Sequence, residues 1–217
     1  MSKTAYLSSA YLAPIQYYQK LASYPQCVIE KYDHYIKQTY RNRCYIAGAE
    51  GIHNLTIPIT KPSTEKCYMR DIQISEHGNW QHMHWNAIIS AYNNTPYFEF
   101  YESDFAPFYH NNKYQYLCDF NEALQELICK LIDLDINYTY TKEYKEAFSE
   151  AEIDFREIIH PKKDFSIADK EFDVVPYYQI FQEKHGFIPN LSIIDLLFNK
   201  GPESIFYLDK SLINQIK

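Results

Sequence analysis

The sequence predicts an α/β protein with a mixed, largely parallel sheet, helices on both faces of that sheet and a β-α-β start, which is a Rossmann-like three-layer architecture. Residues 4–12 have strand composition, Pro14 opens a helical pattern, and residues 27–29 form a compact apolar strand. Hydrophobic residues make up 46% of the 217 residues, which is enough to fill one substantial core. We therefore expect residues 1–217 to fold as a single domain.

A β-hairpin and two amphipathic helices are expected next. Residues 43–47 and 55–59 have strand patterns and are separated by a turn around Gly48 and Gly51. Residues 69–75 alternate as a further short strand, and aromatic side chains crowd residues 97–109. Apolar residues recur at helical spacing over residues 85–92 and, most clearly, over residues 121–133. The second of these helices should cover the sheet.

The C-terminal part of the chain predicts one more strand and two helices. Residues 136–141 are a plausible buried strand, the charged residues 142–170 are expected to form a loop or lid, and residues 174–184 resume a helical period. A short helix should begin after Ser192, the expected N-cap, with Asp195 as its capping-box partner, and end at Gly201. Apolar residues surround this helix, so it should insert into the core.

Composition and charge exclude several classes of protein. The net charge of −7 argues against a general nucleic-acid surface, which needs clustered cations. The 5 cysteines are widely spaced and include no CxxC pair, so we expect reduced thiols and a cytoplasmic protein. The chain opens with no secretory signal pattern, and no apolar run approaches the roughly 20 residues that span a bilayer. We expect no membrane span.

Arg41 and Arg43 are the candidate anion-binding residues. They are two positions apart, so in an extended segment their side chains would point to the same face. Paired guanidinium groups suit bidentate phosphate binding, which makes a nucleotide or a nucleotide-sugar the natural ligand. The alternative is a solvated strand face, with the charge balanced by Glu30, Asp33 and Glu50.

His84 and His160 are the candidate general bases, because an imidazole with a near-neutral pKa accepts a proton efficiently at cellular pH. His84 lies at the start of a predicted helix, where packing or capping is its alternative role. His160 precedes Pro161, which forces an extended backbone and presents the imidazole from a loop. His77, His82 and His84 are close in sequence, but no carboxylate follows in a matching register. We therefore expect neither a metal nor another cofactor.

Several short motifs are spread over most of the chain. They are Tyr11-Leu12-Ala13-Pro14, Tyr40-Arg41-Asn42-Arg43, Leu55-Thr56-Ile57-Pro58-Ile59, Trp85 with Ser90-Ala91-Tyr92, Asp104-Phe105 and the segment from Phe187 to Gly201. In these motifs the chain resembles the WbqC-like family, which occurs in gene clusters for O-antigen and other surface polysaccharides. It departs from longer relatives at Ala13, where they have histidine, glutamine or asparagine, and it lacks their Gly-Ser-Lys-Thr-like middle segment.

The resemblance implies a cytoplasmic transferase of O-antigen-type cell-surface polysaccharide biosynthesis, which transfers glycine or another aminoacyl group from an activated donor to a sugar. Within the matching motifs, the candidate substrate-binding residues beside the two arginines are Asn42, Trp85, Tyr92, Asp104 and Asn190. The aromatic neighbours of Asp104 suit the stacking of a sugar ring. The contrasting hypothesis is a non-catalytic nucleotide- or sugar-binding accessory protein, with the same cation pair but no working base.

Overall fold

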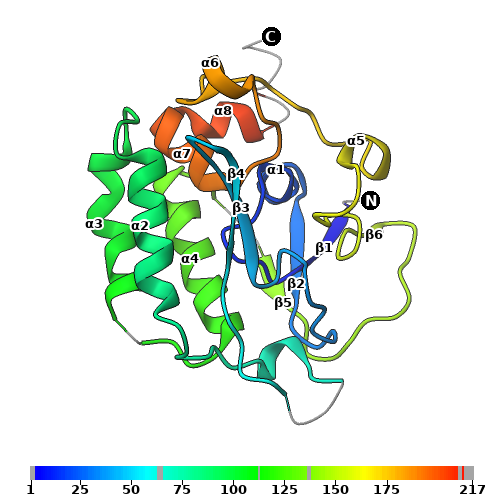
Figure 1. The fold of residues 1–217 in the computed structure, drawn as a ribbon. Coiled ribbons are helices and arrows are strands. Elements are labelled where there is room, and N and C mark those ends of the chain that lie inside the picture. The colour runs from blue at the N-terminus through cyan, green and yellow to red at the C-terminus, as the bar shows by residue number, and fades with distance from the viewer. Residues whose placement is uncertain (1–2, 63–65, 112, 136–137, 210–211, 213–217) are drawn as a thin grey trace.

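The computed structural model describes residues 3–62, 66–111, 113–135, 138–209 and 212. A parallel four-stranded sheet lies at its centre, with the strand order β5-β2-β1-β6 (Figure 1). Its strands are β1 (Thr4–Ser8), β2 (Gln26–Glu30), β5 (Tyr138–Tyr140) and β6 (Glu152–Asp154). A separate antiparallel hairpin joins β3 (Arg43–Gly48) to β4 (Gly51–Thr56). The α/β class is confirmed, and the arrangement is consistent with a Rossmann-like architecture.

The β-α-β start has the predicted order. Helix α1 (Ile15–Ser23) connects β1 to β2, and the two strands pair in parallel, with Ala5 opposite Cys27 and Leu7 opposite Ile29. The Cys27 thiol lies 3.7 Å from a backbone oxygen of α1, so these four residues face that helix. Strand β1 is shorter than the predicted residues 4–12, because the chain turns at Leu12, which has a φ of +40°.

Three longer helices, α2 (Trp80–Tyr92), α3 (Phe98–His110) and α4 (Leu117–Leu131), form the side of the molecule drawn in green in Figure 1. Helices α2 and α4 begin at Trp80 and Leu117, earlier than the predicted residues 85 and 121. The aromatic-rich residues 97–109 form most of α3. The sequence of this segment does not indicate a helix, because aromatic side chains occupy both of its faces and give no apolar period. Phe100 is 73% exposed, while Phe98 and Phe105 are buried.

Two predicted elements are wrong. Residues 69–75 form a 3₁₀ turn at Met69–Asp71, followed by single β-bridges of Gln73 and Ile74, rather than a strand. Residues 174–184 are helical only in α6 (Gln182–His185). Pro176 gives a physical reason for the second error, since proline has no N–H for a helix and disfavours helical geometry in the residue before it.

Residues 142–170 contain more regular structure than a loop. They supply β6, which pairs in parallel with β1 at the edge of the sheet, and the short helix α5 (Phe165–Ala168). Phe148 packs edge-on against Tyr6 at 4.9 Å between ring centroids, on the sheet face opposite α1. The segment therefore covers part of that face. The predicted strand over residues 136–141 appears as β5, and its first two residues lie outside the described part of the chain.

The N-termini of α1 and of helix α7 (Ile193–Lys200) are joined to each other by backbone hydrogen bonds. The N–H of Ile193 donates to the carbonyl of Ala13 at 2.9 Å, and the N–H of Ile15 donates to the carbonyl of Leu191 at 3.0 Å. An N–H group at the start of each helix is thus satisfied by a carbonyl of the segment that precedes the other helix. Two of the sequence motifs, at opposite ends of the chain, therefore form one structural unit.

Helix α7 is the buried, short helix that the sequence predicts, but its predicted capping box is wrong. The Ser192 hydroxyl donates to the carbonyl oxygen of Leu12 at 2.7 Å, and it makes no hydrogen bond to its own helix. Asp195 is fully buried and accepts hydrogen bonds from Tyr92, Tyr177 and Gln179 instead. Both side chains tie α7 to distant segments, because a buried polar group must find a partner wherever one lies.

The end of α7 is as predicted. The helix stops at Gly201, which has a φ of +55°, and the chain continues through a 3₁₀ turn (Gly201–Ser204) into α8 (Ile205–Leu208). A Cβ added at Gly201 would lie 2.4 Å from the ring of Tyr97. Only glycine therefore satisfies both the backbone conformation and the available space here.

Replacing Ser192 with alanine is expected to lower the free energy of unfolding by about 1 kcal/mol, because the buried carbonyl of Leu12 loses its side-chain donor. Urea denaturation followed by circular dichroism measures the change. Ser166→Ala provides a comparison, since the Ser166 hydroxyl bonds only to the adjacent, exposed Asp164. An unchanged unfolding midpoint for Ser192→Ala would show that this bond contributes nothing.

In the part of the chain that the structure describes, we find no helix with the length and apolar character needed to cross a bilayer. The cysteines are all free, and Cys27, Cys44, Cys118 and Cys129 are buried. Burial raises the pKa of each of these four thiols, which keeps them protonated and unreactive. Cys44 belongs to the hydrophobic core.

Candidate functional site

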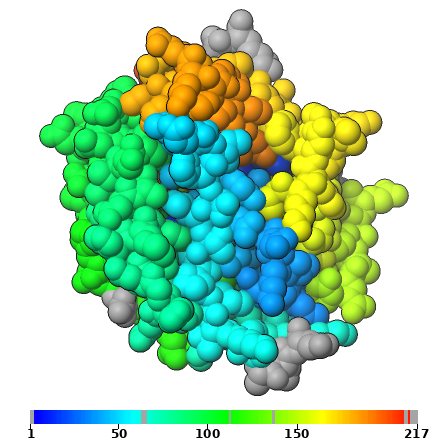
Figure 2. All heavy atoms as spheres, in the orientation of Figure 1, coloured from blue at the N-terminus to red at the C-terminus, as the bar shows by residue number. Residues whose placement is uncertain are grey.

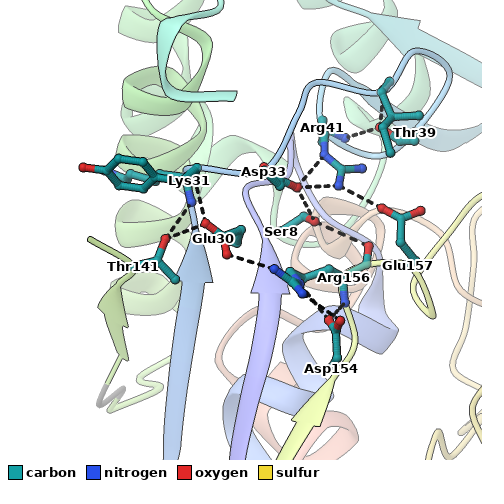
Figure 3. Close-up of polar contacts among 12 residues, drawn as sticks. Ser8, Glu30, Lys31, Asp33, Thr39, Arg41, Thr141, Asp154, Arg156 and Glu157 are labelled. Carbon is teal, nitrogen blue, oxygen red and sulfur yellow. Dashed lines mark hydrogen bonds and ion pairs between the residues drawn. The ribbon is translucent and has the colours of Figure 1, made fainter. Parts of the chain in front are cut away.

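A cleft of about 590 Å³ opens where parallel strands β1, β2 and β6 end, at Ser8, Glu30 and Asp154 (Figure 3). This is the edge of an α/β sheet at which ligands usually bind, and the volume lies within the range of ligand pockets. Residues 32–41, Tyr68 and residues 144–157 supply its walls. Figure 2 shows the yellow segment that contains part of this wall lying along the blue segment that follows β2.

Arg156, two residues after β6, binds two carboxylates at once. Its Nη1 donates to Glu30 Oε2 at 2.9 Å, while its Nε and Nη2 donate to the two oxygens of Asp154 at 2.8 and 2.9 Å. The rings of Tyr144 and Phe148 lie 4.9 and 5.0 Å from the guanidinium carbon. Glu30 has no exposed surface, so Arg156 supplies the countercharge that this carboxylate needs in the interior.

Arg41 makes the second ion-pair group, on the other side of Ser8. Its Nε and Nη2 donate to Asp33 Oδ2 at 3.1 and 2.5 Å, and Nη2 also donates to Glu157 Oε1 at 2.9 Å. The side chains of Arg41 and Asp33 are 3% and 8% exposed, whereas that of Glu157 is 50% exposed. The Ser8 hydroxyl lies 3.4 Å from Asp33 Oδ2 and bridges the two ion-pair groups through the backbone oxygen of Arg156.

Asp33 is a buried carboxylate of the cleft with one oxygen that no described residue pairs. Its Oδ2 receives every hydrogen bond described above, while its Oδ1 is buried and has no hydrogen-bond partner among the described residues. Burial raises the pKa of Asp33 above the ordinary aspartate value, and the neighbouring Arg41 guanidinium opposes that rise. A buried carboxylate with a raised pKa and one unpartnered oxygen is well suited to accept a proton.

Aromatic rings form much of the remaining wall. His34 and Tyr68 stack on each other, with ring centroids 5.2 Å apart and an interplanar angle of 12°. Tyr32 lies beside Tyr68, at 6.3 Å, and Tyr144 contributes a ring that is 47% exposed as a residue. Exposed ring faces next to carboxylates provide the combination of stacking and hydrogen bonding that sugars and other polar rings need.

Comparison with known proteins identifies a family for this chain. The model of the WbqC-like protein family matches residues 9–161 and 154–207, which include Asp33, Arg41 and Arg156. The chain belongs to the WbqC-like family. It is also similar to the "Uncharacterized protein Rv1507c" of Mycobacterium tuberculosis, with 25% identity over 227 residues that cover 96% of this chain and 98% of that protein. No solved structure shows a significant match.

The arginine pair expected of this WbqC-like protein is divided between two environments. Arg41 is buried and lines the cleft. Arg43, at the start of β3, instead donates from Nε to Thr56 Oγ1 across the hairpin at 2.9 Å. Asn42 between them is buried and donates to the carbonyl oxygen of Ile57 at 2.8 Å, so it connects the residue before β3 to the residue after β4. A joint phosphate clamp of the two arginines stays a prediction.

His84, one of the two predicted bases, lies within the aromatic core rather than at the cleft. Its Nδ1 is 3.0 Å from the hydroxyl of Tyr11, which in turn lies 2.9 Å from the hydroxyl of Tyr109. Burial lowers the pKa of His84 to about 4, so the ring is neutral at cellular pH. Trp85 is also buried and stacks on Tyr109 at 5.5 Å. These environments favour structural roles for both residues.

The remaining residues predicted on α2, on α3 and before α7 also lie away from the cleft. Tyr92 is buried and its hydroxyl donates to Asp195 at 3.0 Å. Asp104 is exposed on α3. Asn190 has a φ of +56°, and its Oδ1 accepts a hydrogen bond from the N–H of Gln16 at 3.0 Å. Asn190 thereby caps α1 from a position far along the chain.

His160, the second predicted base, lies close to the cleft. Its Nδ1 accepts a hydrogen bond from the backbone N–H of Lys162 at 3.0 Å, which leaves Nε2 for another partner. Partial burial lowers its pKa, Glu157 opposes that change, and the positive charges of Arg41 and its lysine neighbours add to it. Of the predicted site residues, the structure thus brings Arg41 and His160 into one neighbourhood.

The sequence patterns do not identify four residues as functional candidates: Asp33, Arg156 and Glu157, which line the cleft, and Glu30, which is buried beside Arg156. The sequence does carry a signal for Glu30 and Asp33. They lie at and just after the end of an apolar strand in a predicted β-α-β unit, where α/β proteins place ligand-binding groups. Arg156 and Glu157 lie in a segment whose strand is only 3 residues long, so no periodicity reveals it. Among the described residues, we find no group of histidine, cysteine and acidic side chains arranged to hold a metal ion.

Proposed function

We propose that this WbqC-like protein is a cytoplasmic transferase of cell-surface polysaccharide biosynthesis, which holds a sugar acceptor in the cleft and uses Asp33 as its general base. The observation that carries the proposal is the environment of Asp33. This carboxylate lies at the ligand-binding edge of the sheet, is oriented by Arg41 and Ser8, and keeps one oxygen without a partner among the described residues.

The proposed step is transfer of an aminoacyl group from an activated donor to the sugar. A hydroxyl or amine of the sugar attacks the activated acyl carbon and forms a C–O or C–N bond. The bond from that carbon to the leaving group breaks, Asp33 takes the proton of the attacking group, and that proton then passes to the leaving group or to water. A raised pKa makes Asp33 a stronger base than an ordinary aspartate.

The aromatic wall supports the assignment of a sugar as the acceptor. The rings of Tyr68 and Tyr144 offer faces on which a sugar can stack, and the carboxylates of Asp154 and Glu157 accept hydrogen bonds from hydroxyl groups. Both carboxylates are partly exposed, with side-chain exposures of 35% and 50%. A ligand therefore reaches these two carboxylates without breaking their ion pairs with the arginines.

The test is a binding and turnover experiment on wild-type protein, Asp33→Asn and Tyr144→Ala. Nucleotide-linked sugars are titrated by calorimetry and then mixed with aminoacyl adenylates or aminoacyl thioesters, and mass spectrometry detects the aminoacylated sugar. Tyr144→Ala should weaken binding about tenfold, since stacking contributes about 1.4 kcal/mol. Asp33→Asn should lose turnover by a factor of about 10²–10⁴, which is far more than any change in the affinity for the sugar.

Matched controls separate these effects from damage to the fold. Tyr178→Ala removes a tyrosine of similar exposure, 49% against 47%, that lies outside the cleft wall, and Asp119→Asn changes an exposed aspartate on α4. Both should behave as wild type. Sugar binding that Tyr144→Ala leaves unchanged would contradict the proposed location. Binding without turnover by any donor would favour the accessory-protein hypothesis.

A further inference from the structure

The cleft carries more negative than positive charge. Each of its two arginines is already paired with two carboxylates: Arg41 with Asp33 and Glu157, and Arg156 with Glu30 and Asp154. Of these carboxylates, Asp33, Asp154 and Glu157 line the cleft together with the exposed Glu146, whereas Glu30 is fully buried. The arginines are therefore neutralised, and the excess charge is carried by carboxylates.

Two carboxylate oxygens at the Arg41 side are left for a ligand. Oδ1 of Asp33 is buried without a partner among the described residues, and the residue is only 6% exposed, so a ligand reaches this carboxylate at its edge beside the more exposed Glu157. Glu157 uses Oε1 for Arg41, and its Oε2 accepts no hydrogen bond from any residue that the structure describes. Both residues bond to the same guanidinium nitrogen, so their carboxylates lie on either side of it.

An unpartnered carboxylate oxygen requires a hydrogen-bond donor, and the excess negative charge selects a positively charged one. We infer that the ligand brings a protonated amine to the Asp33 and Glu157 carboxylates. This inference rests on the proposed function and narrows its substrate class. The amine belongs either to an amino sugar as acceptor or to the aminoacyl group of the donor, because both present the same ammonium.

A phosphate group suits this position less well. Only Nη1 of Arg41 makes no hydrogen bond to a described residue, and phosphate oxygens there would meet the carboxylates of Asp33 and Glu157, which share Nη2 of the same guanidinium. Like charges that face each other in a partly buried site repel. A phosphate at Arg41 Nη1 would therefore lie beside two carboxylates, whereas an ammonium group at this position adds an opposite charge to them.

The experiment uses two probe pairs that differ by one ammonium group: glucosamine against glucose, and glycinamide against acetamide. Each is titrated into the full chain by NMR under mildly acidic conditions, with glucose 6-phosphate as an anionic comparison. In at least one pair the amine should bind about tenfold more tightly, which corresponds to one charge-assisted hydrogen bond. The pair that shows the preference identifies the sugar or the aminoacyl group as the source.

Glu157→Gln tests the position of the ammonium. It removes one negative charge from a half-exposed side chain, and it should reduce the preference for the amine at least threefold. Glu183→Gln is the matched control, because it makes the same change at an exposed site on α6, outside the cleft. The control should keep the full preference.

The outcomes distinguish this inference from the proposed function. Equal binding of glucose and glucosamine, with no preference for glycinamide, overturns the ammonium site but leaves a sugar-binding transferase intact. If glucose 6-phosphate binds more tightly than glucosamine, the ammonium site is overturned as well, and Arg41 is again the candidate phosphate-binding residue. A preference that Glu157→Gln and Glu183→Gln leave equally unchanged places the amine elsewhere and contradicts the inference. The proposed function fails separately, if no sugar binds and no donor is turned over.

Discussion

Replacing Arg156 with methionine is expected to lower the free energy of unfolding by about 3–5 kcal/mol, because it leaves Glu30 as an unpaired charge in the interior. Glu30 is fully buried, and its other oxygen is bonded to the hydroxyl of Thr141 and the N–H of Tyr32. Methionine preserves much of the apolar volume between the rings around Arg156, so the loss is chiefly electrostatic. Urea denaturation at neutral pH measures it.

Arg70→Met is the matched control for this experiment. Arg70 is 45% exposed, lies over the ring of Tyr32 at 4.4 Å, and is 3.5 Å from Asp71 in an exposed ion pair. Its replacement should cost less than about 1 kcal/mol. The double variant Arg156→Met with Glu30→Gln should recover part of the lost stability, because it removes the unpaired charge. A single variant as stable as Arg70→Met would show that Glu30 finds its countercharge elsewhere.

The parts of the fold that the sequence predicts are those with local causes. The β-α-β start, the hairpin and α4 each have a periodic apolar pattern, and their existence and order are confirmed. The second hairpin strand is displaced, because it runs over Gly51–Thr56 and not over the predicted residues 55–59. The wrong helix over residues 174–184 shows the limit of this reasoning. Tyr177 belongs to that apolar pattern, but it is buried with Gln179 where both donate hydrogen bonds to Asp195, and not on one face of a helix.

The site is less predictable because its partners are far apart in sequence. Arg41 is identifiable as a candidate, but its meaning depends on Asp33 and on Glu157, which is 116 positions away. The sequence alone allows Asp33 to be read as a balancing surface charge, whereas the structure buries it. His84 shows the opposite case. Its imidazole has the right chemistry for a base, but burial among Tyr11 and other aromatic rings lowers its pKa to about 4.

The motif residue Asp195 has a role that capping rules do not describe, and its removal should have a large effect. Its Oδ1 accepts a hydrogen bond from Tyr92 at 3.0 Å, and its Oδ2 accepts bonds from Tyr177 at 2.6 Å and Gln179 at 3.0 Å. Asp195→Ala removes the acceptor of the buried Tyr92 and Tyr177 hydroxyls and one of the acceptors of Gln179, which still donates to the carbonyl of Ile188. At about 1–3 kcal/mol for each lost partner, with partial relaxation, we expect a loss of about 3–5 kcal/mol in the free energy of unfolding.

Asp195→Asn separates the charge of this residue from its hydrogen bonds. Burial raises the pKa of Asp195 in the folded protein, and the three donors only partly oppose that rise. As pH rises above the ordinary aspartate pKa, the unfolded chain releases this proton first, so wild-type stability falls until the folded protein releases it as well. Asparagine does not titrate. The stability of Asp195→Asn relative to wild type should therefore improve as pH rises from about 3.5 to neutrality, by about 1.4 kcal/mol for each unit by which the pKa is raised.

Urea denaturation of the two proteins across this pH range measures that difference, in which the titration of all other groups cancels. Asp104→Asn, an exposed change on α3, should show a difference from wild type that is nearly independent of pH. If Asp195→Asn instead loses stability relative to wild type as pH rises, the folded protein must hold Asp195 ionised at a lowered pKa. The three hydrogen bonds would then outweigh burial, and the carboxylate would stabilise the junction of α2 and α7 through its charge.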